Sequence, residues 1–542
     1  MIPRARKRPS EFRALLVYPN LTLMLVPPVS IALFTDILKR LGYQVDLFDA
    51  TSYMSPEESS HPARRAKYLQ SRRYDEKSLY WDVKTDLLGD FRRKIDAFEP
   101  DVLLVSIVED TWPQALQLID SVKHLAIPTL VGGVFPTFAP ELVISHPDIS
   151  MVGVGEGESI ISDVCERLRK GEPLDDTPGL WLKKQDGTVV RNAMAPLVDI
   201  SEKALPDFSL FDEARFYRPM GGQIFKTIPL ETYRGCPFTC TFCNSPGQVK
   251  LARDGGLGMF TRRKRFDRLA QELRTLIERH DPEFVYIYDD SFMARPDEEH
   301  YAFCEMYREF KLPFWCQTRV ETVSAEKLGA LKDVGAFRMS YGIEHGNEQF
   351  RKERLYRNVT NQMMFEKFEL IHGAGIPFTV NNVVGLPYET RALAFDSIEF
   401  NRKISGLYDS STVSIFTPYH GTVLREMALK EGWLPERAQT NSMTTRSLLE
   451  MPAPYLSPDE IDGLLRTFNL YAKLPRERWT EVARAETPDD EGNAAWERLA
   501  GEYDVLQFGG QEAVRRAQET ANKGGTGCRA SDTETISFER SA

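Results

Sequence analysis

Long apolar runs are absent from this chain of 542 residues. No stretch approaches the roughly 18 apolar residues that a membrane-spanning helix needs. An excess of positive charge is absent as well, since 68 Lys and Arg stand against 79 Asp and Glu and the formal net charge is −11. Nucleic-acid binding is therefore disfavoured, because such proteins are expected to be basic. The basic residues 1–10 have no apolar run behind them, so no signal peptide is expected and we expect a cytoplasmic protein.

Cysteine is scarce, with seven residues in the chain. A disulfide framework would need many more, so we expect reduced thiols inside the cell. The rest of the composition is ordinary, with 42% hydrophobic and 27% charged residues, which excludes a wholly disordered or fibrous chain. At about 150 residues per domain, the length predicts three or four structural units.

Residues 11–173 alternate between short apolar runs and segments with helical spacing of apolar residues. The apolar runs are continuous, which is typical of parallel strands covered by helices on both faces. We therefore predict a Rossmann-like, doubly wound α/β domain. Its strands are expected near residues 14–20, 44–50, 100–110, 127–137 and 149–158. In such folds ligands bind at the carboxyl ends of the strands.

A second series of strand–helix units follows a proline-containing linker. The linker spans residues 174–223, and a small hairpin is expected in it around residues 186–187. Six strand–helix units over residues 224–424 predict a (β/α)6 partial TIM barrel, with function at the C-terminal ends of its strands. Residues 425–521 are predicted to be a helical C-terminal domain. Residues 522–542, rich in Gly, Ser, Thr and charge, are predicted to be a disordered tail.

Three of the cysteines, Cys236, Cys240 and Cys243, lie close together directly after the first expected strand of the barrel. Thiolates this close repel one another and oxidise, so a metal centre is the natural reason for them. A structural zinc would prefer four protein ligands, and no second Cys or His pair follows at a suitable spacing. Iron–sulfur clusters accept Cys ligands at short spacings, and three ligands leave one iron open. The pattern favours an iron–sulfur cluster, with structural zinc or chance as the alternatives.

This Cys-x-x-x-Cys-x-x-Cys pattern at the end of a barrel's first strand resembles that of the radical S-adenosylmethionine (SAM) enzymes. The resemblance implies that the cysteines hold a [4Fe–4S] cluster, that SAM binds the open iron, and that one electron cleaves SAM to a 5′-deoxyadenosyl radical. It continues through the segments YIYDDSF, WCQTRVE, YGIEHGNE, VVGLPYET and TPYHGT. The SAM contacts that it implies are Asp289 or Asp290, Arg319, Glu344, Gly385 and Pro387.

The chain departs from the family pattern at three of these segments. The usual Gly-Gly-Glu is absent at the second strand, where Asp289 or Asp290 takes its place as the contact to the SAM amino group. His345 stands where the family has Ser, beside the glutamate expected at the ribose. Tyr388 stands where the family has the second Gly of Gly-Leu-Pro-Gly-Glu-Thr.

Structural alternatives accompany these assignments. Arg319 and Glu344 are alternatively an ion pair inside the barrel, and Gly385 and Pro387 are alternatively turn residues alone. The remaining cysteines are interpreted as packed thiols, apart from one in the tail: Cys165, Cys304, Cys316 and Cys528.

Two glycine-rich segments, VGGVFPTFAPE and VGVGEGE, end the fourth and fifth strands of the N-terminal domain. They resemble the cobalamin-binding domain of a large radical SAM subclass. Glycine at a strand end lets the backbone approach a flat macrocycle and its nucleotide tail. The residues predicted to contact cobalamin are Ser106, Val108, Glu109, Asp110, Thr111, Gly132, Gly133, Pro136, Thr137, Gly155, Glu156 and Gly157.

Two other nucleotide or cobalamin motifs are missing from this domain. No Gly-x-Gly-x-x-Gly follows the first strand, which argues against a dinucleotide. The Asp-x-His-x-x-Gly motif of many cobalamin carriers is replaced by Pro19, Asn20 and Leu21, so the cobalt is expected to lack a His ligand from this motif. Residues 108–112 are predicted to lie at the lower cobalt face. The alternative is a nucleotide-binding or purely structural domain.

Together the resemblances imply a C-methyltransferase acting on a small molecule or natural-product intermediate. The deoxyadenosyl radical would take hydrogen from an unactivated carbon, the substrate radical would take a methyl group from methylcobalamin, and a second SAM would remethylate cob(I)alamin. The helical C-terminal region would cover the substrate. The alternatives are a cobalamin-dependent radical SAM cyclase or rearrangement enzyme without methyl transfer, and a non-catalytic cobalamin or metal sensor. A flavodoxin- or ferredoxin-like electron donor is expected. A peptide substrate is less expected, because no peptide-recognition domain precedes residue 11.

Overall fold

The computed structural model describes residues 6–21, 26–54, 68–72, 74, 79, 82–202, 204–440 and 446–509. The predicted tail, with Cys528, lies outside these residues, as does most of the polar stretch between residues 55 and 82. No helix among the described residues is long and apolar enough to cross a membrane.

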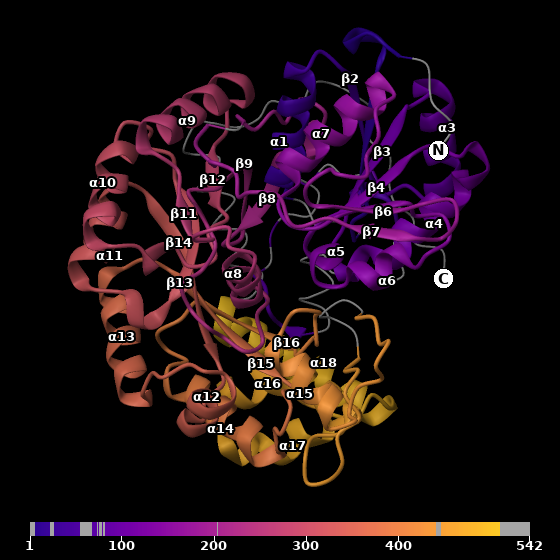
Figure 1. The fold of residues 1–542 in the computed structure, drawn as a ribbon. Helices are drawn as coiled ribbons and strands as arrows, with labels where there is room; N and C mark the ends of the chain where they lie inside the picture. Colours follow the sequence, from indigo (N-terminus) through magenta and orange to yellow (C-terminus); the bar gives the residue numbers. More distant parts are fainter. Residues whose placement is uncertain are drawn as a thin grey trace, which may run out of the picture.

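A seven-stranded sheet forms the core of the N-terminal unit (Figure 1). Its strand order is β2-β1-β3-β4-β5-β6-β7, parallel from β2 to β5 and antiparallel beyond it. The strands are β1 (Arg13–Tyr18), β2 (Gln44–Asp49), β3 (Val102–Ser106), β4 (Thr129–Gly132), β5 (Met151–Gly153), β6 (Leu180–Lys183) and β7 (Val189–Arg191). The helices are α1 (Val29–Arg40), α3 (Leu87–Phe98), α4 (Trp112–Val122), α5 (Val134–Phe138), α6 (Pro140–Ile144) and α7 (Gly157–Lys170). The predicted doubly wound α/β fold is confirmed.

Two details of this unit differ from the sequence expectation. The fourth strand stops at Gly132, and the residues after it form helix α5, because Gly133 turns the chain with a φ of 125°. The hairpin expected in a linker is β6–β7, and it pairs with β5 as part of the first sheet. The segment 174–223 therefore contributes strands to both sheets, since β8 (Tyr217–Met220) belongs to the second.

The second sheet is the partial barrel, with strand order β16-β15-β14-β13-β12-β9-β8. All neighbouring pairs from β9 to β16 are parallel, and β8 pairs antiparallel with β9. The strands after β8 are β9 (Gln223–Leu230), β12 (Phe284–Ile287), β13 (Phe314–Arg319), β14 (Ala336–Glu344), β15 (Phe378–Val384) and β16 (Ser410–Ile415). A separate two-stranded ribbon joins β10 (Tyr233–Arg234) and β11 (Arg262–Arg263). The six parallel strands confirm the predicted (β/α)6 architecture.

Helices alternate with the strands of this sheet, and α9, α10, α11 and α13 cover its outer face at the left of Figure 1. They are α8 (Ser245–Asp254), α9 (Phe266–His280), α10 (Asp297–Tyr307), α11 (Ala325–Asp333), α12 (Glu348–Arg354), α13 (Asn361–Ala374) and α14 (Arg391–Lys403). Polar side chains start several of them by accepting a backbone N–H of the first turn: Ser324, Asn347, Thr360 and Thr390. Helix α9 buries Leu269, Leu273 and Leu276 at helical spacing against the sheet.

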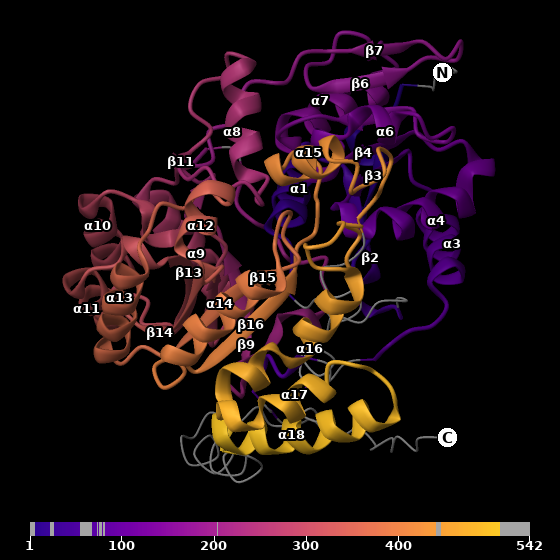
Figure 2. The same cartoon turned by 90° about the horizontal axis from the view of Figure 1, so that it is seen from below.

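Four more helices are described after the barrel, and α16, α17 and α18 lie at the bottom of Figure 2. They are α15 (Val423–Lys430), α16 (Pro458–Lys473), α17 (Trp479–Arg484) and α18 (Asp490–Phe508). Helix α16 begins with a capping box between Ser457 and Glu460, with Pro458 in its first turn. It packs on α14 and on β16, the last strand of the sheet, where Asn469 donates to the Ser411 carbonyl (3.3 Å). The helical C-terminal region thus covers an edge strand that would otherwise be open.

Candidate functional site

The loop after β9 carries Cys236, Cys240 and Cys243 at the C-terminal end of the barrel. Gly235 opens it with a φ of 91°, and a Cβ there would lie 2.8 Å from Phe260. Thr241 fixes its middle by donating to the Arg354 carbonyl (2.6 Å). The loop is thus held by α12, while helix α8 begins directly after the last cysteine.

All three cysteine side chains are partly buried and free of disulfides. Burial raises the pKa of Cys236 to about 11 and that of Cys243 to about 12, and it raises the pKa of Cys240 as well. Two donors point at their sulfurs: the Ser245 N–H at the start of α8 lies 3.4 Å from Cys243 Sγ, and Arg319 Nη1 lies 3.5 Å from Cys240 Sγ. These groups favour thiolates once a metal displaces the protons.

The spacing of the thiols bears on the metal centres considered from the sequence. Three sulfurs around one zinc would lie about 3.8 Å apart, given tetrahedral bonds of about 2.3 Å. Among the described residues, three ligand atoms within 4.8 Å of one another occur only at Asp120, His146 and Asp148, on the surface of the N-terminal unit. The three thiols do not all lie within that distance of one another, so their side chains are not arranged around a single ion.

The two aspartates after β12 have different surroundings. Asp290 accepts from Ser245 Oγ (3.0 Å), lies near Cys236 and Cys243, and has its pKa raised by burial. Asp289 is buried on the other side, where it accepts the N–H groups of Thr232 (2.8 Å) and Tyr233 (3.0 Å) and pairs with Arg295. Of the two alternatives for a SAM contact, the geometry therefore favours Asp290.

Arg319 and Glu344 both lie beside the cysteine loop but do not pair with each other. Arg319 stacks over Phe238 at 3.8 Å and pairs with Glu321. Glu344 takes a left-handed φ of 64° and accepts from Arg357 Nη1 (2.8 Å). Arg357 was missed from the sequence, because it belongs to no motif and reaches the site only through the fold.

The turn after β15 holds Gly385, Pro387 and Tyr388. Glu389 Oε2 accepts the N–H groups of Gly385 (2.6 Å) and Leu386 (3.0 Å), and Glu389 Oε1 lies 3.3 Å from His345 Nε2. His345, which replaces the family's Ser, is thus a fully buried partner of this turn. Tyr388, which replaces the family's Gly, has a φ of 69°, the left-handed conformation that glycine adopts without strain.

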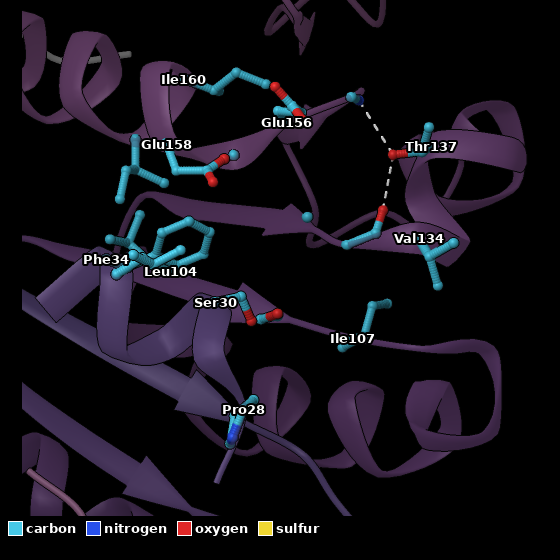
Figure 3. Close-up of a pocket in the computed structure, with 18 of the residues that line it drawn as sticks. Pro28, Ser30, Phe34, Leu104, Ile107, Val134, Thr137, Glu156, Glu158 and Ile160 are labelled. Carbon is cyan, nitrogen blue, oxygen red and sulfur yellow. Dashed lines mark hydrogen bonds between the residues drawn. The ribbon is translucent and has the colours of Figure 1, made fainter. Parts of the chain in front are cut away.

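A cavity of about 440 Å³ opens at the carboxyl ends of the first sheet (Figure 3). Most of the predicted cobalamin contacts line it: Ser106, Val108, Gly132, Gly133, Thr137, Gly155, Glu156 and Gly157. No histidine stands among the described residues that line it. The residues predicted with them that do not line it are Glu109, Asp110, Thr111 and Pro136.

The glycines of this cavity have distinct roles. A Cβ on Gly133 would lie 2.2 Å from the Ile107 carbonyl oxygen, so only glycine fits there, whereas a Cβ on Gly132 would meet nothing within 4 Å. Thr137 ties the two glycine-rich segments together: its hydroxyl donates to the Gly133 carbonyl (2.8 Å) and accepts the Gly155 N–H (3.1 Å), as Figure 3 shows. The result is an open floor with a fixed backbone, which suits a large, flat ligand.

Glu109 and Asp110 contact the barrel instead of the cavity. Glu109 is buried and accepts from His420 Nδ1 (2.9 Å) and from the Thr440 N–H (3.1 Å). Asp110 accepts from the Tyr419 hydroxyl (3.0 Å). These residues therefore join the loop after β3 to the loop after β16.

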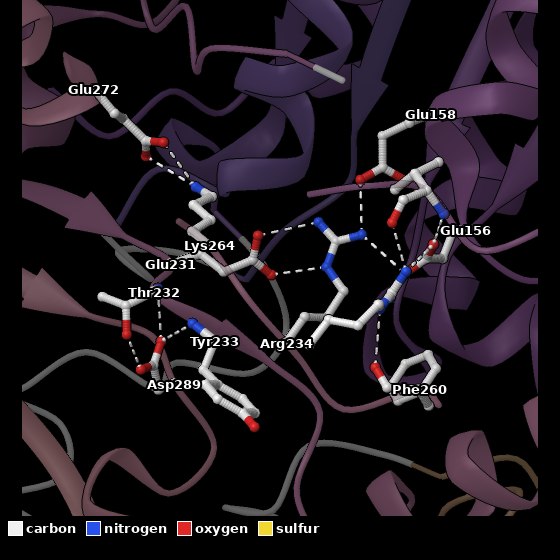
Figure 4. A network of polar contacts seen from close by, with 12 residues as sticks. Glu156, Glu158, Glu231, Thr232, Tyr233, Arg234, Phe260, Lys264, Glu272 and Asp289 are labelled. Atoms are coloured by element: carbon white, nitrogen blue, oxygen red, sulfur yellow. Dashed lines mark hydrogen bonds and ion pairs between the residues drawn. The ribbon is translucent and has the colours of Figure 1, made fainter. Parts of the chain in front are cut away.

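A second polar contact connects the cavity with the cysteine loop (Figure 4). Arg234, two residues before Cys236, pairs through Nη1 with Glu156 (3.0 Å) and Glu158 (2.8 Å) and through Nε with Glu231 (2.9 Å). Burial opposes its charge, but the three carboxylates outweigh that effect and raise its pKa well above the usual value. Arg262 adds a second cation on Glu156.

Family models and known proteins agree with this arrangement. Residues 23–164 match the B12 binding domain, and residues 230–400 match the radical SAM superfamily. The chain is 25% identical over 383 residues to a protein of Pyrococcus horikoshii named uncharacterized methyltransferase PH0819, covering 70% of this chain and 80% of the relative. It is 22% identical over 514 residues to the cytidylyl-2-hydroxyethylphosphonate methyltransferase of Streptomyces wedmorensis, covering 86% and 89%.

Solved structures share the fold. The cobalamin-dependent SAM radical enzyme OxsB, with aqua-cobalamin and SAM bound, superposes with a TM-score of 0.62 at 15% identity, covering 94% of this chain and 75% of that one. The radical SAM methyltransferase TsrM from Kitasatospora setae superposes with a TM-score of 0.60 at 16% identity, covering 94% and 99%. The two matched domains imply a [4Fe–4S] cluster, SAM and cobalamin as cofactors, and the chain belongs to the cobalamin-dependent radical SAM enzymes.

Proposed function

We propose that this enzyme transfers a methyl group to an unactivated carbon of a small-molecule or natural-product substrate. The observation that carries the proposal concerns Arg234, whose ion pairs Figure 4 shows: it lines the cavity of the first sheet and lies two residues before Cys236. The two cofactors would thus lie at neighbouring ends of two sheets. The methyltransferase names of several relatives support the same reading.

When bound, the cluster and SAM supply a 5′-deoxyadenosyl radical that removes hydrogen from the substrate, and cobalamin supplies the methyl group. The chain's own residues bind, orient and shield these groups. Cys236, Cys240 and Cys243 would hold the cluster, and Asp290 would accept from the SAM amino group. Arg319 would pair with the SAM carboxylate.

The remaining proposed SAM contacts lie further around the barrel rim. Glu344 would accept from the ribose hydroxyls, with Arg357 holding its carboxylate in place. The turn at Gly385 and Pro387 would border the adenine. Asp289 would act indirectly, by fixing the backbone of Thr232 before the cysteine loop.

For cobalamin we propose contacts from the cavity-lining glycines and from Thr137 and Glu156. Val108, 46% exposed at the cavity, would lie at the lower cobalt face, and the cobalt would have no histidine ligand. Glu109, Asp110, Thr111 and Pro136 would shape that side without touching the cofactor.

We also propose a division of labour along the chain. Residues 11–173 would carry cobalamin, residues 174–223 would connect, residues 224–424 would generate the radical, and the helices from residue 425 would cover the substrate. A flavodoxin- or ferredoxin-like protein would supply the electron. The free thiols and the reduced cluster suit the cytoplasm.

Anaerobic reconstitution with iron, sulfide and cobalamin, followed by assay with SAM and a reductant, tests the function. We expect 5′-deoxyadenosine together with S-adenosylhomocysteine. Deoxyadenosine without S-adenosylhomocysteine would favour the cyclase or rearrangement reading. Neither product from a chain with an intact cluster would favour a sensor, and a chain that binds no cobalamin would exclude both cobalamin-dependent enzyme readings.

A further inference from the structure

The inner face of the partial barrel is not filled. Along β15, Phe378, Val380 and Val384 are buried against the outer helices, whereas the alternating residues Thr379 and Asn381 stay partly exposed on the inner face. Strand β16 shows the same alternation. An eight-stranded barrel fills its interior with side chains, but this six-stranded one leaves an accessible inner wall.

Two stacked rings form one side of that interior. Tyr286 on β12 and Trp315 on β13 lie parallel, with ring centroids 4.2 Å apart and an angle of 11° between the planes. Trp315 Nε1 donates to Ser340 Oγ (3.2 Å), which fixes the indole. Deeper in the sheet a small apolar cluster with Phe284 and Met220 fills the space. We call Tyr286 and Trp315 the aromatic platform.

A cation lies on the free face of this platform. The guanidinium of Arg218, on β8, lies 4.2 Å from the centroid of the Tyr286 ring. Its Nε is buried without a hydrogen-bond partner, and no carboxylate of the described residues forms an ion pair with it. The neighbouring cations differ, since Arg215 pairs with Asp49 (2.8 Å) and Arg338 pairs with Asp409.

Tyr288 links this place to the cobalamin cavity. Its ring meets Tyr286 edge-on at 5.3 Å. The residue is 38% exposed, yet burial raises the pKa of its hydroxyl. Its hydroxyl also interacts electrostatically with Arg218 and with Tyr18, and Tyr18 lines the cavity of the first sheet.

An arginine that is partly buried without an anion has lost hydration that an aromatic ring replaces only in part. Its planar fork matches a carboxylate, phosphate or phosphonate. Resting on the function proposed above, we propose that the substrate is an anion whose acid group pairs with Arg218 at the edge of the aromatic platform.

Binding of small probes to the reconstituted holoenzyme, measured by equilibrium dialysis, tests this substrate class. The probes are phenylphosphonate, phenylacetate and the neutral phenylacetamide. We expect both anions to bind at least about tenfold more tightly than the amide. A tighter phosphonate than carboxylate would assign a phosphate-type group, and the reverse order a carboxylic acid.

Arg218→Gln removes the charge but keeps a planar group over Tyr286, and Arg218→Lys keeps the charge without the fork. We expect the first to lower anion affinity by about 10- to 100-fold and the second by less, with phenylacetamide binding unchanged. Arg191→Gln is the matched control, because Arg191 also stacks on a ring, Trp181 at 5.0 Å, but on the distant β7. Iron and cobalamin contents report whether each variant is intact.

Equal binding of acid and amide, no anion binding at about 10 mM, or unchanged binding by Arg218→Gln would each overturn the proposal. The test is separate from that of methyl transfer. A chain that binds phenylphosphonate through Arg218 but forms no S-adenosylhomocysteine would retain the anion site and lose the methyltransferase assignment. A chain that forms 5′-deoxyadenosine and S-adenosylhomocysteine but binds the acid and amide probes equally would retain the methyltransferase assignment and lose the anion site.

Discussion

The two cofactor regions of this molecule are formed by different chemical groups. The cavity of the first sheet has a floor of glycine backbone, with Gly132 leaving open space and Gly133 admitting no side chain at all. The rim of the barrel presents thiols and charges instead, with Arg319 and Asp290 beside the cysteines. A bulky ligand of mostly neutral groups is recognised by shape, and small charged groups are recognised by fixed charges. Ligand binding in the first region should therefore be weakened by substitutions that enlarge a side chain, and function of the second region by substitutions that remove a thiol or a charge.

Removing a thiol gives the largest expected effect. Cys240→Ala leaves two ligands for the cluster, so we expect deoxyadenosine formation to fall to background while cobalamin binding persists. Electron paramagnetic resonance of the reduced chain and product analysis measure this. Cys304→Ala is the control, since that thiol is buried in the core and its loss should leave the cluster signal intact. Loss of cobalamin in Cys240→Ala would break the separation between the two regions.

Substitution of Arg234, whose ion pairs connect the two regions, gives the next largest expected effect on product formation. Arg234→Lys keeps a positive charge but loses the two parallel bonds to Glu231. We expect S-adenosylhomocysteine formation to fall by about 10- to 100-fold, with deoxyadenosine formation falling less, because the cofactors lose their common support. Arg263→Lys, in the same ribbon but paired with Glu299, is the control. An equal fall of both products would mean that Arg234 serves only the cysteine loop.

Substitution of the cavity glycines by alanine tests whether their backbone forms the cobalamin-binding surface. Gly133→Ala should destabilise the N-terminal unit by about 2–4 kcal/mol, through backbone strain and the clash with Ile107. Gly132→Ala should leave stability within about 0.5 kcal/mol of the parent but weaken cobalamin binding about tenfold, because its methyl group enters the cavity. Denaturant unfolding and absorbance titration measure the two effects. Equal cobalamin affinity in Gly132→Ala and the parent would show that the floor is not the binding surface.

The smallest expected effect concerns Glu109. Burial opposes its charge, but bonds from His420 and Thr440 outweigh it and hold its pKa below the usual range. A lowered pKa stabilises the folded state above the unfolded pKa of about 4.3, and that contribution is lost as the pH falls through the folded value. Glu109→Gln should thus cost about 1–3 kcal/mol at pH 7 and progressively less below pH ~4.3.

Unfolding in denaturant at several pH values measures the effect of Glu109. Glu141→Gln, an exposed residue on α6, is the control. A difference between Glu109→Gln and the parent that stays constant down to about pH 3 would exclude titration of Glu109 as its origin.

The sequence allowed the elements to be predicted well, because period and composition are local. The six barrel strands, the cysteine loop and the glycine-rich strand ends all follow from runs of fewer than a dozen residues. Contacts between distant segments could not be predicted in the same way. Glu109 meets His420 across 311 residues, and Glu156 meets Arg234 across 78. Nothing near either residue signals its partner.

Positions at which this chain departs from the family motifs were the second limit on prediction from the sequence. His345 and Tyr388 could be identified as departures from a pattern, but not explained. The fold explains His345 as a buried partner of Glu389. The role proposed for Arg218 could not be predicted from neighbouring residues either. It depends on the ring of Tyr286, which lies on a strand two places away in the sheet.

The turn after β15 has a consequence for engineering. Two backbone N–H groups of that turn bind one carboxylate oxygen of Glu389. The shape of the turn is therefore held by a side chain, and this is why a tyrosine can occupy the left-handed position 388. A substitution at position 388 would lose the bond from the Tyr388 hydroxyl to Glu431 (2.9 Å) and the contact with Arg354, whose guanidinium lies 4.0 Å from the ring centroid, but it would leave the bonds of Glu389 to the turn in place. Position 389 is the one to leave alone.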